Sequence, residues 1–268
     1  HFYMNGKKVG KDEMAPGWTS YHKHLCYQTY DVTNFLKKGR NMLGAMLGAG
    51  WYKGKMGFLL LRNNYGTQTA FLMQMKVRYK DGREVWFATD ESFLGHDAPI
   101  TFSEIYDGEE YDARILPGYE TPEKLLAPEV NGEFKGELVP SEGAEIYFRH
   151  ELALSPVKAY VWEGVSGESK DEFGKIIVKK EYKAGEPMTV KPGEKLVVDF
   201  GQNCAGVPSF VFNAAEGTVL ECITSELLND GNGAKSRGMD GPEGSVHRLN
   251  LRIPDSGMIL KYTFANSA

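Results

Sequence analysis

The stretch "AFLMQMKVRYKDGREVWFAT", residues Ala70–Thr89, decides the fold class. Apolar and polar residues alternate on both sides of Asp81-Gly82, a dipeptide typical of the turn between two antiparallel strands. Alternation places Met75 and Val77 on one face of a strand, with charged residues on the other. The stretch therefore predicts a β-hairpin with one buried face.

The rest of the chain repeats this pattern of short alternating runs between turns. Asn5-Gly6 predicts a type I′ hairpin near the start. "DVTNFLKKGRN" predicts one short helical turn, which Asp31 or Thr33 can cap. "EKLVVDFG" and "VPSFVFNA" predict further strands in the second half. No run has the length and period of a long helix, so we expect an all-β chain of β-sandwiches.

Composition narrows the classes of partner. Glycine accounts for 31 of 268 residues without any period, as expected for many turns between short strands. The net charge is −5 and no basic block occurs, which argues against nucleic acid and anionic membranes as partners. No apolar run reaches the ~18–20 residues of a membrane span. Cys26, Cys204 and Cys222 are widely spaced, so we expect buried free thiols instead of a disulfide framework or a zinc site.

A change in pattern suggests where the chain divides. The span Pro117–Gly143 is rich in proline and has the weakest periodicity, which predicts a long surface excursion. A boundary at Phe148–Pro156 follows, giving domains 1–150 and 151–268. Both lengths are usual for β-sandwiches.

Several motifs resemble one family. "NGKKVG", "APGWTSYHKHLCYQTYDVTNFLKKGRNMLGAMLGAGWYKGKMGF" and "SEIYDGEEYDARI" resemble the N-terminal, sugar-binding-like domain of bacterial α-L-rhamnosidases. "VVDFGQNCAGVPSF", followed by "ITSELLNDG", resembles the concanavalin-like sandwich that comes next in those enzymes. "DVTNFLKKGRN" alone is also found in related jelly rolls of β-galactosidases. The series of motifs in this order is what identifies the family.

The resemblance implies a fold and a function. The fold is a galactose-binding-like jelly roll followed by a concanavalin-like sandwich. The family hydrolyses terminal α-L-rhamnosyl groups with inversion, using carboxylates of a later helical barrel that these residues do not contain. We therefore expect a non-catalytic front part, inactive alone, whose partners are a rhamnose-containing glycan and the C-terminal helical barrel. A purely structural brace and a free-standing lectin-like module are the alternatives. The compartment stays open among periplasm, cell exterior and cytoplasm of a bacterium.

The aromatic pair in "LGAGWYKGKMG", residues Leu47–Gly57, is the first candidate site. An exposed ring can stack on the apolar face of a sugar while polar neighbours bind its hydroxyls. Because large aromatic residues are more often buried, we favour the other interpretation, in which Trp51 closes the end of the core. Exposure of Trp51 distinguishes the two. The carbohydrate-binding candidates here and in the similar turn "APGWTSYHKH" are Trp51, Tyr52, Lys53, Trp18 and Tyr21.

The acidic stretch "SEIYDGEEYDARI" supplies three more carbohydrate-binding candidates, Tyr106, Asp107 and Glu110. Glycosidases use paired carboxylates, so catalysis is one interpretation. The resemblance assigns catalysis to the barrel, and we therefore expect no catalytic residue here. A solvated acidic turn is favoured, and a grip on a sugar or a neighbouring domain is the intermediate interpretation.

The resemblance also bears on metals. Family members that bind rhamnose through calcium place an acidic or amide residue in the turn before the residue that matches Trp51. Here that turn is Ala49-Gly50, which offers no side-chain oxygen, whereas calcium requires hard oxygen ligands. We therefore expect no cofactor and no metal ligands, and any sugar binding should be independent of calcium.

Polar residues after the strand-like run in "VVDFGQNCAG" form the last group. Short polar side chains often hydrogen-bond to the backbone of a loop and fix a tight turn. The resemblance suggests that this turn faces the barrel. The structural-turn candidates are Asp199, Gln202, Asn203 and the nearby Glu226.

Overall fold

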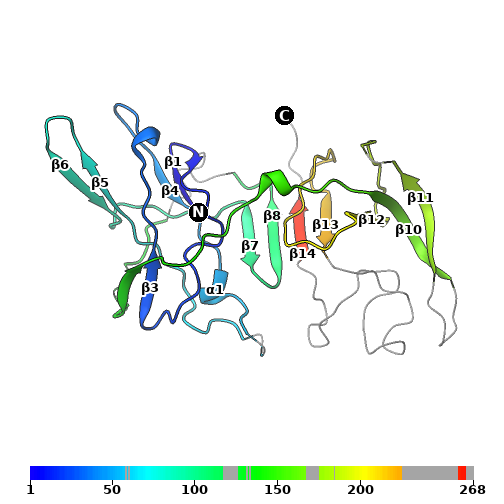
Figure 1. Cartoon of the computed structure of the whole chain (residues 1–268), viewed down its shortest axis with the longest axis horizontal. Coiled ribbons are helices and arrows are strands. Elements are labelled where there is room, and N and C mark those ends of the chain that lie inside the picture. The colour runs from blue at the N-terminus through cyan, green and yellow to red at the C-terminus, as the bar shows by residue number, and fades with distance from the viewer. Residues whose placement is uncertain are drawn as a thin grey trace. The chain divides into compact units, whose positions relative to one another are not determined.

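A computed structural model describes residues 1–57, 59, 61–116, 126–130, 132, 134–166, 175–183, 185–224 and 259–263. Its regular elements are nearly all strands, and the α-helix α1 (Gly50–Lys53) is a single turn (Figure 1). The predicted all-β fold is confirmed. Within the described residues, no helix combines the length and the apolar character required to cross a membrane.

The chain forms two compact units. Unit 1 contains His1–Phe148, to which Ala214–Glu221 and residues 260–263 return from the end of the chain. Unit 2 contains Arg149–Asn213 with residues 222–224 and 259. The division of the sequence into domains 1–150 and 151–268 stays a prediction.

Unit 1 begins with a three-stranded antiparallel sheet of β1 (Phe2–Met4), β2 (Lys7–Lys8) and β4 (Leu43–Ala45), with β1 in the centre. Asn5 and Gly6 join β1 to β2 and have φ angles of 52° and 78°. Two successive positive φ values define the predicted type I′ turn, which is confirmed. Met4 is fully buried beneath this sheet.

The predicted helical turn is the 3₁₀ helix η1 (Thr33–Phe35). The predicted cap was wrong, because Val32 occupies the N-cap position and no side chain caps the helix; Asp31, one residue earlier, accepts the Thr33 N–H at 2.9 Å in a local turn. Asn5 Nδ2 donates to the Phe35 carbonyl at 2.8 Å, so the first hairpin fixes the end of η1. Gly39 follows with a φ of 89°, and the chain returns as β4.

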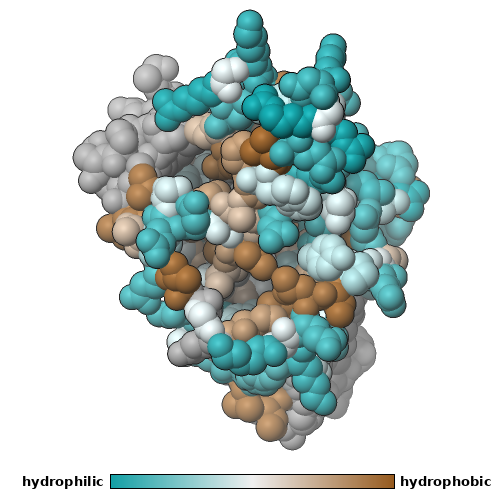
Figure 2. All heavy atoms as spheres, turned by 90° about the vertical axis from the view of Figure 1, so that its left-hand side faces the viewer, coloured by the Kyte–Doolittle hydropathy of each residue, from teal (hydrophilic) through white to brown (hydrophobic). Residues whose placement is uncertain are grey.

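The hairpin predicted from Ala70–Thr89 is β5 (Gln74–Arg78) with β6 (Glu84–Ala88). Exposure alternates along β5 as expected, with Met75 and Val77 half-buried. Gly82, at a φ of 85°, donates its N–H to the Tyr79 carbonyl at 3.0 Å and closes a short loop. Figure 2 views the side of unit 1 that carries this hairpin and shows apolar side chains among polar ones at the surface.

Two further sheets complete unit 1. β3 (His24–Tyr27) pairs in parallel with β9 (Glu137–Pro140). A four-stranded sheet has the order β13-β14-β8-β7. Its strands are β13 (Val219–Ile223), β14 (Ile259–Thr263), β8 (Gly108–Asp112) and β7 (Ile100–Glu104). The tight turn between β7 and β8 carries the acidic stretch.

Unit 2 is built on one antiparallel sheet, which follows a short 3₁₀ helix η4 (His150–Leu152). β10 (Lys158–Ser166) lies between β11 (Lys175–Tyr182) and β12 (Lys195–Asp199). Ala159, Tyr160 and Val161 of the central strand are buried and form the core of this unit.

Two expectations for the second half were wrong. "VPSFVFNA" is not a strand: residues 207–214 have no regular structure, and Val211 is fully exposed. An alternating pattern becomes a strand only where another strand supplies hydrogen bonds, and no described strand pairs with this segment. The three cysteines are free, but Cys204 is exposed, not buried. Cys222 is half-buried, and burial raises the pKa of its thiol.

Candidate functional site: an aromatic cluster and a charged network

The turn that carries Trp51 and Tyr52 is the short helix α1. The Lys53 N–H donates to the Ala49 carbonyl at 3.0 Å, and the Gly54 N–H donates to the Gly50 carbonyl at 3.2 Å. A Cβ at Gly54 would lie 2.5 Å from the Gly50 carbonyl oxygen, so only glycine ends the helix in this way. The glycine-rich sequence thus produces one helical turn that presents two aromatic side chains.

Tyr21 is the centre of an aromatic cluster, which we define as Trp18, Tyr21, His22, Tyr52 and Tyr65. The Tyr21 ring centroid lies 5.6 Å from that of Tyr52 and 4.8 Å from that of Tyr65, with an edge-on geometry in both pairs. Tyr52 and Tyr65 stack at 6.3 Å, and His22 lies 5.2 Å from Tyr65. Edge-on and offset arrangements are the favourable geometries for aromatic pairs. The cluster therefore has a defined packing and is not a loose collection of rings.

Tyr21 is only 6% exposed and fixes the inner part of the cluster. Its hydroxyl donates to the Gly17 carbonyl at 3.0 Å. Burial, with smaller contributions from Tyr65 and Cys26, raises the pKa of Tyr21 to about 12. Tyr21 thus packs as a neutral core residue and supports the cluster from within, and its role in sugar binding stays a prediction.

Trp18 lies at the open side of the cluster. The residue as a whole is 56% exposed, and its indole N–H donates to the Tyr65 hydroxyl at 3.0 Å. The polar end of the ring is therefore satisfied inside the protein, while much of its apolar surface faces solvent. An indole held in this way can stack against the C–H face of a sugar.

Trp51 and Tyr52 are both half-buried, and Lys53 beside them is exposed. Tyr52 packs so closely on Gly66 that a Cβ there would lie 2.3 Å from the Tyr52 hydroxyl. Among the described residues, no ring contact joins Trp51 to the cluster. The half-buried state of Trp51 leaves both of its interpretations as predictions, whereas Trp18 has the open ring.

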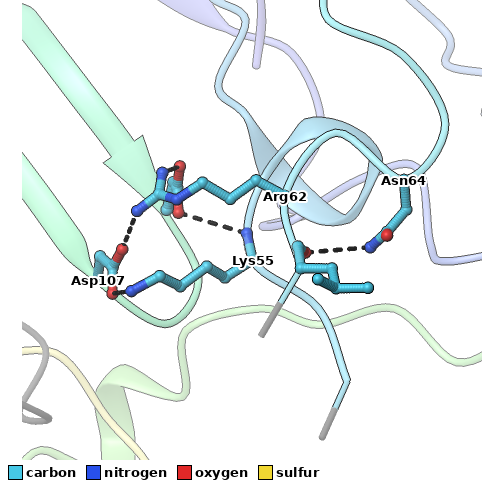
Figure 3. A network of polar contacts seen from close by, with 6 residues as sticks. Lys55, Arg62, Asn64 and Asp107 are labelled. Carbon is cyan, nitrogen blue, oxygen red and sulfur yellow. Dashed lines mark hydrogen bonds and ion pairs between the residues drawn. The ribbon is translucent and has the colours of Figure 1, made fainter. Parts of the chain in front are cut away.

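A charged network holds the segment that follows α1 (Figure 3). Lys55 Nζ lies 2.7 Å from Asp107 Oδ1, and the Arg62 guanidinium bonds both Glu104 and Asp107. The Lys55 N–H also donates to Glu104 Oε2 at 3.3 Å. Glu104 is buried, and two cationic side chains compensate the two carboxylates at the end of the β7–β8 hairpin. The network closes the segment onto that hairpin.

Pairs of residues from the two sides of the loop, each pair lying inside the previous one in sequence, hold the segment from Tyr52 to Gly66. Tyr52 and Tyr65 meet through their rings, and the Asn63 N–H donates to the Lys53 carbonyl at 2.9 Å. Lys55 and Arg62 share their carboxylate partners. Each inner pair brings the two sides of the loop closer, and the Tyr52 and Tyr65 rings at its ends therefore meet.

Sugar binding by the acidic stretch stays a prediction, and its three candidates have different surroundings. Asp107 is committed to two cations, whereas Tyr106 and Glu110 are exposed on the β7–β8 hairpin. Glu109 is half-buried, and burial raises the pKa of its carboxyl. The structure therefore brings Trp18, Tyr21 and Tyr52 into one cluster but places Tyr106, Asp107 and Glu110 outside it.

Sequence reasoning missed Tyr65 and Arg62, which hold the cluster and the network. Tyr65 follows Asn63-Asn64 and precedes Gly66, so the turn-like "NNYG" was the only hint of a fixed loop. Asn63 has a φ of 58°, and Asn64 Nδ2 donates to the Leu61 carbonyl at 3.1 Å (Figure 3). The contacts of Tyr65 and Arg62 follow no periodic pattern of residues, so the sequence alone could not predict them.

The turn after β12 contains the last group of candidates. Asp199 Oδ1 accepts the Gly201 N–H at 2.7 Å, and the Asp199 carbonyl accepts the Val157 N–H at 2.8 Å. Gln202 and Asn203 are exposed, and Glu226 lies outside the described residues. Within the described part of the chain, no group of three His, Cys, Asp or Glu side chains could hold a metal ion.

Comparison with models of known protein families identifies the family of the chain. The family model for the α-L-rhamnosidase N-terminal domain matches residues 1–143, more than half of the chain. The chain belongs to the bacterial α-L-rhamnosidase family. The model for the bacterial α-L-rhamnosidase concanavalin-like domain matches residues 189–263, so both domains occur in the predicted order.

Individual relatives agree with this assignment. An α-L-rhamnosidase of Streptomyces avermitilis is 28% identical over 256 residues, which cover 93% of this chain and 21% of that protein. One from Formosa agariphila is 31% identical over 235 residues, covering 85% of this chain and 22% of the relative. The chain thus spans about a fifth of the length of these relatives.

Solved structures lead to the same family. The S. avermitilis α-L-rhamnosidase complexed with L-rhamnose superimposes with a TM-score of 0.67 at 27% identity, over 98% of this chain and 22% of that one. The native enzyme from Aspergillus terreus gives a TM-score of 0.64 at 25% identity, over 98% and 26%. The fold of the α-L-rhamnosidase front part is therefore present here.

Proposed function

We propose that this chain is the non-catalytic, carbohydrate-recognising front part of an α-L-rhamnosidase. It would bind a rhamnose-containing glycan and support the helical barrel that hydrolyses terminal α-L-rhamnosyl groups. The single observation that carries the proposal is the open indole of Trp18, anchored by Tyr65 above a buried tyrosine. Membership in the family supports the choice of rhamnose as the sugar.

The cluster suggests how a sugar would bind. The apolar face of the ring would stack on Trp18, and polar groups at the border of the cluster would bind hydroxyls. His22 beside Tyr65 and the exposed Lys53 are such groups. One stacked ring and a few hydrogen bonds on an open surface support a dissociation constant on the order of millimolar. Ala49-Gly50 offers no side-chain oxygen, so binding should need no calcium.

A titration with L-rhamnose, followed by tryptophan fluorescence with and without a chelator, tests this proposal. We expect a millimolar response that the chelator leaves unchanged. Trp18→Ala should weaken binding by about tenfold, the effect of losing one well-placed ring contact. Trp86→Ala is the matched control, because Trp86 is 62% exposed but lies on β6, outside the cluster. No response, or a micromolar response that the chelator abolishes, would contradict the proposal.

The proposal also requires that the chain alone be inactive. Glu104 and Asp107 are two carboxylates brought together at one end of the β7–β8 hairpin, and Arg62 bonds both of them. A general acid and a base must instead be free to exchange protons with a glycosidic oxygen and a water. Incubation with an aryl α-L-rhamnoside should release no aryl group above a buffer blank. Release that survives purification controls would place a catalytic pair in this chain.

A structural brace is the second candidate function, and residues 207–212 favour it. Val211 is fully exposed, and Phe210 and Phe212 are exposed on either side of it. A run of apolar side chains on a segment that pairs with none of the described strands is suited to a neighbouring domain. Hydrogen exchange in this segment should slow in a fusion that supplies the helical barrel of an α-L-rhamnosidase. Equal exchange in the fusion and in the chain alone would remove this candidate.

A further inference from the structure

A polar pocket lies in unit 2, where β12 begins. Lys195, the first residue of β12, pairs with Trp162 of β10. Among the described residues, β10 continues beyond this pair without a partner on that side. A cavity of about 240 Å³ lies here, lined by side chains that include Trp162, Glu163, Lys179, Glu194 and Lys195. None of these residues belongs to the aromatic cluster of unit 1.

One wall of this pocket is an ion pair that spans the central strand. Lys179 of β11 lies 3.0 Å from Glu194, which immediately precedes β12, and β10 runs between the two strands. Glu194 Oε2 also accepts the Lys191 N–H at 2.9 Å across a tight turn in which Gly193 has a φ of 82°. Both carboxylate oxygens are thus fixed, and the wall exists before any ligand arrives.

Trp162 supplies an unused donor. Among the residues that the structure describes, its buried indole N–H finds no hydrogen-bond partner, whereas buried donors are almost always paired. The Lys195 ammonium lies 4.6 Å from the centre of the Trp162 ring. The register between β10 and β11 also shifts on both sides of Trp162, a bulge of the kind found where a strand redirects a side chain. A ligand oxygen would complete the hydrogen bonding of this indole.

The charges around the pocket limit the class of ligand. The lining carries two lysines and two glutamates, so the formal charges balance. Glu194, with a smaller contribution from Glu163, raises the pKa of Lys179, which places both carboxylates near this ammonium. An anion would meet Glu163 and Glu194, and a cation would meet the two lysines. A neutral compound with many hydroxyls can donate to the carboxylates and accept from the ammonium and indole groups.

We propose that this pocket is a second carbohydrate site, which binds one neutral sugar residue through Trp162, Glu163 and Lys179. The site is separate from the proposed Trp18 site in sequence and in unit. It can therefore exist whether or not the Trp18 site binds rhamnose. A glycan could then contact the front part of the enzyme at two independent points.

Indole N–H signals in NMR spectra of the ¹⁵N-labelled full chain test the two sites separately. The probes are L-rhamnose, D-galactose and D-glucuronate, and Trp162→Phe identifies the Trp162 signal. We expect a neutral sugar to shift this signal saturably, with a dissociation constant on the order of millimolar. An unmoved Trp162 signal would overturn the proposal, and a shift with glucuronate alone would overturn the neutral-ligand assignment. The Trp18 signal reports the proposed rhamnose site independently.

If Trp162→Phe does not fold, variants at exposed positions still test the proposal. The Trp162 indole signal is then assigned through the backbone amide of Trp162. Glu163→Gln and Lys179→Met should each weaken the response of the Trp162 signal by about tenfold, as expected for losing one charge-assisted hydrogen bond. Lys180→Met is the matched control, because Lys180 is the next residue of β11 and its ammonium lies over Tyr182, 4.4 Å from the ring centre. Wild-type affinity in both pocket variants, or an equal loss in the control, would overturn the assignment of the site.

Discussion

The segment between Tyr52 and Gly66 is held at its ends by rings and in its middle by charges. At the ends, Tyr52 and Tyr65 pack on the buried Tyr21. In the middle, Lys55 and Arg62 bind two carboxylates of the β7–β8 hairpin. Ring packing depends on shape and excludes water, whereas partly exposed ion pairs are weakened by solvent and salt. The comparison suggests that the rings set the position of Trp18 and that the charges mainly close the loop.

Removing the central ring should have the largest effect. Tyr21→Ala should lower the free energy of unfolding by about 3 kcal/mol, since it empties a buried aromatic site. Tyr21→Phe keeps the ring and loses only the bond to the Gly17 carbonyl, so about 1 kcal/mol is expected. Urea unfolding of both variants measures the difference. A Tyr21→Ala variant as stable as Tyr21→Phe would mean that the cluster is not a packed core.

Opening the charged network should have the next largest effect. Glu104→Ala leaves Arg62 with one carboxylate. Because the Arg62 side chain is 40% exposed, we expect the free energy of unfolding to fall by about 2 kcal/mol, less than for a fully buried pair. Glu84→Ala is the control, because Glu84 also pairs with two cations, Lys76 and Arg78, but on an exposed hairpin. Thermal unfolding should separate the two. Equal losses would show that burial of Glu104 adds nothing.

Alkaline pH should weaken the ring cluster. Burial raises the pKa of Tyr21 from 10.0 to about 12, so the folded state holds this proton more tightly than the unfolded state. The resulting stability is complete below pH 10 and is lost as the pH rises towards 12. Melting temperatures between these values should fall less steeply in Tyr21→Phe than in the wild type. Tyr79→Phe, in the exposed β5–β6 hairpin, should keep the wild-type slope.

The smallest effect is expected at the surface of the cluster. Trp18→Phe removes the hydrogen bond to Tyr65 but little buried area, so stability should change by less than about 0.5 kcal/mol. Chemical denaturation measures this value, and the same protein can be titrated with L-rhamnose. If the free energy of unfolding falls by more than about 1 kcal/mol, Trp18 is a structural residue, and its interpretation as a ligand platform is contradicted.

The hairpins could be predicted from the sequence because they depend on the residues of the turn itself. Asn5-Gly6 and Asp81-Gly82 identified two hairpins because those φ angles depend on the residues themselves. The segment at residues 207–214 has the same alternation but pairs with no described strand, and its prediction failed. Sequence patterns report what a strand could bury, whereas pairing depends on which other segment is available.

The candidate site was predictable only in part for the same reason. Trp18, Tyr21 and Tyr52 were chosen because aromatics in glycine-rich turns suit sugars, and the structure brings them together. Tyr65, which joins Trp18 to Tyr52, lies far from either turn in sequence. Asp107 was selected for its charge, but Lys55 and Arg62 use that charge. Such pairings arise from tertiary packing and leave no local pattern.

The parallel pairing of β3 with β9 has a consequence for synthesis of the protein. His24 lies opposite Glu137, so β3 leaves the ribosome long before its partner exists. At ordinary rates of chain elongation that interval is roughly ten seconds, during which Leu25 and Tyr27 lack the strand that pairs with them in the native structure. Closing so long a loop is also a slow folding step. Unit 1 should therefore acquire its hairpins during translation but complete its native topology late, and nascent chains that end before Pro140 should be the species most dependent on chaperones.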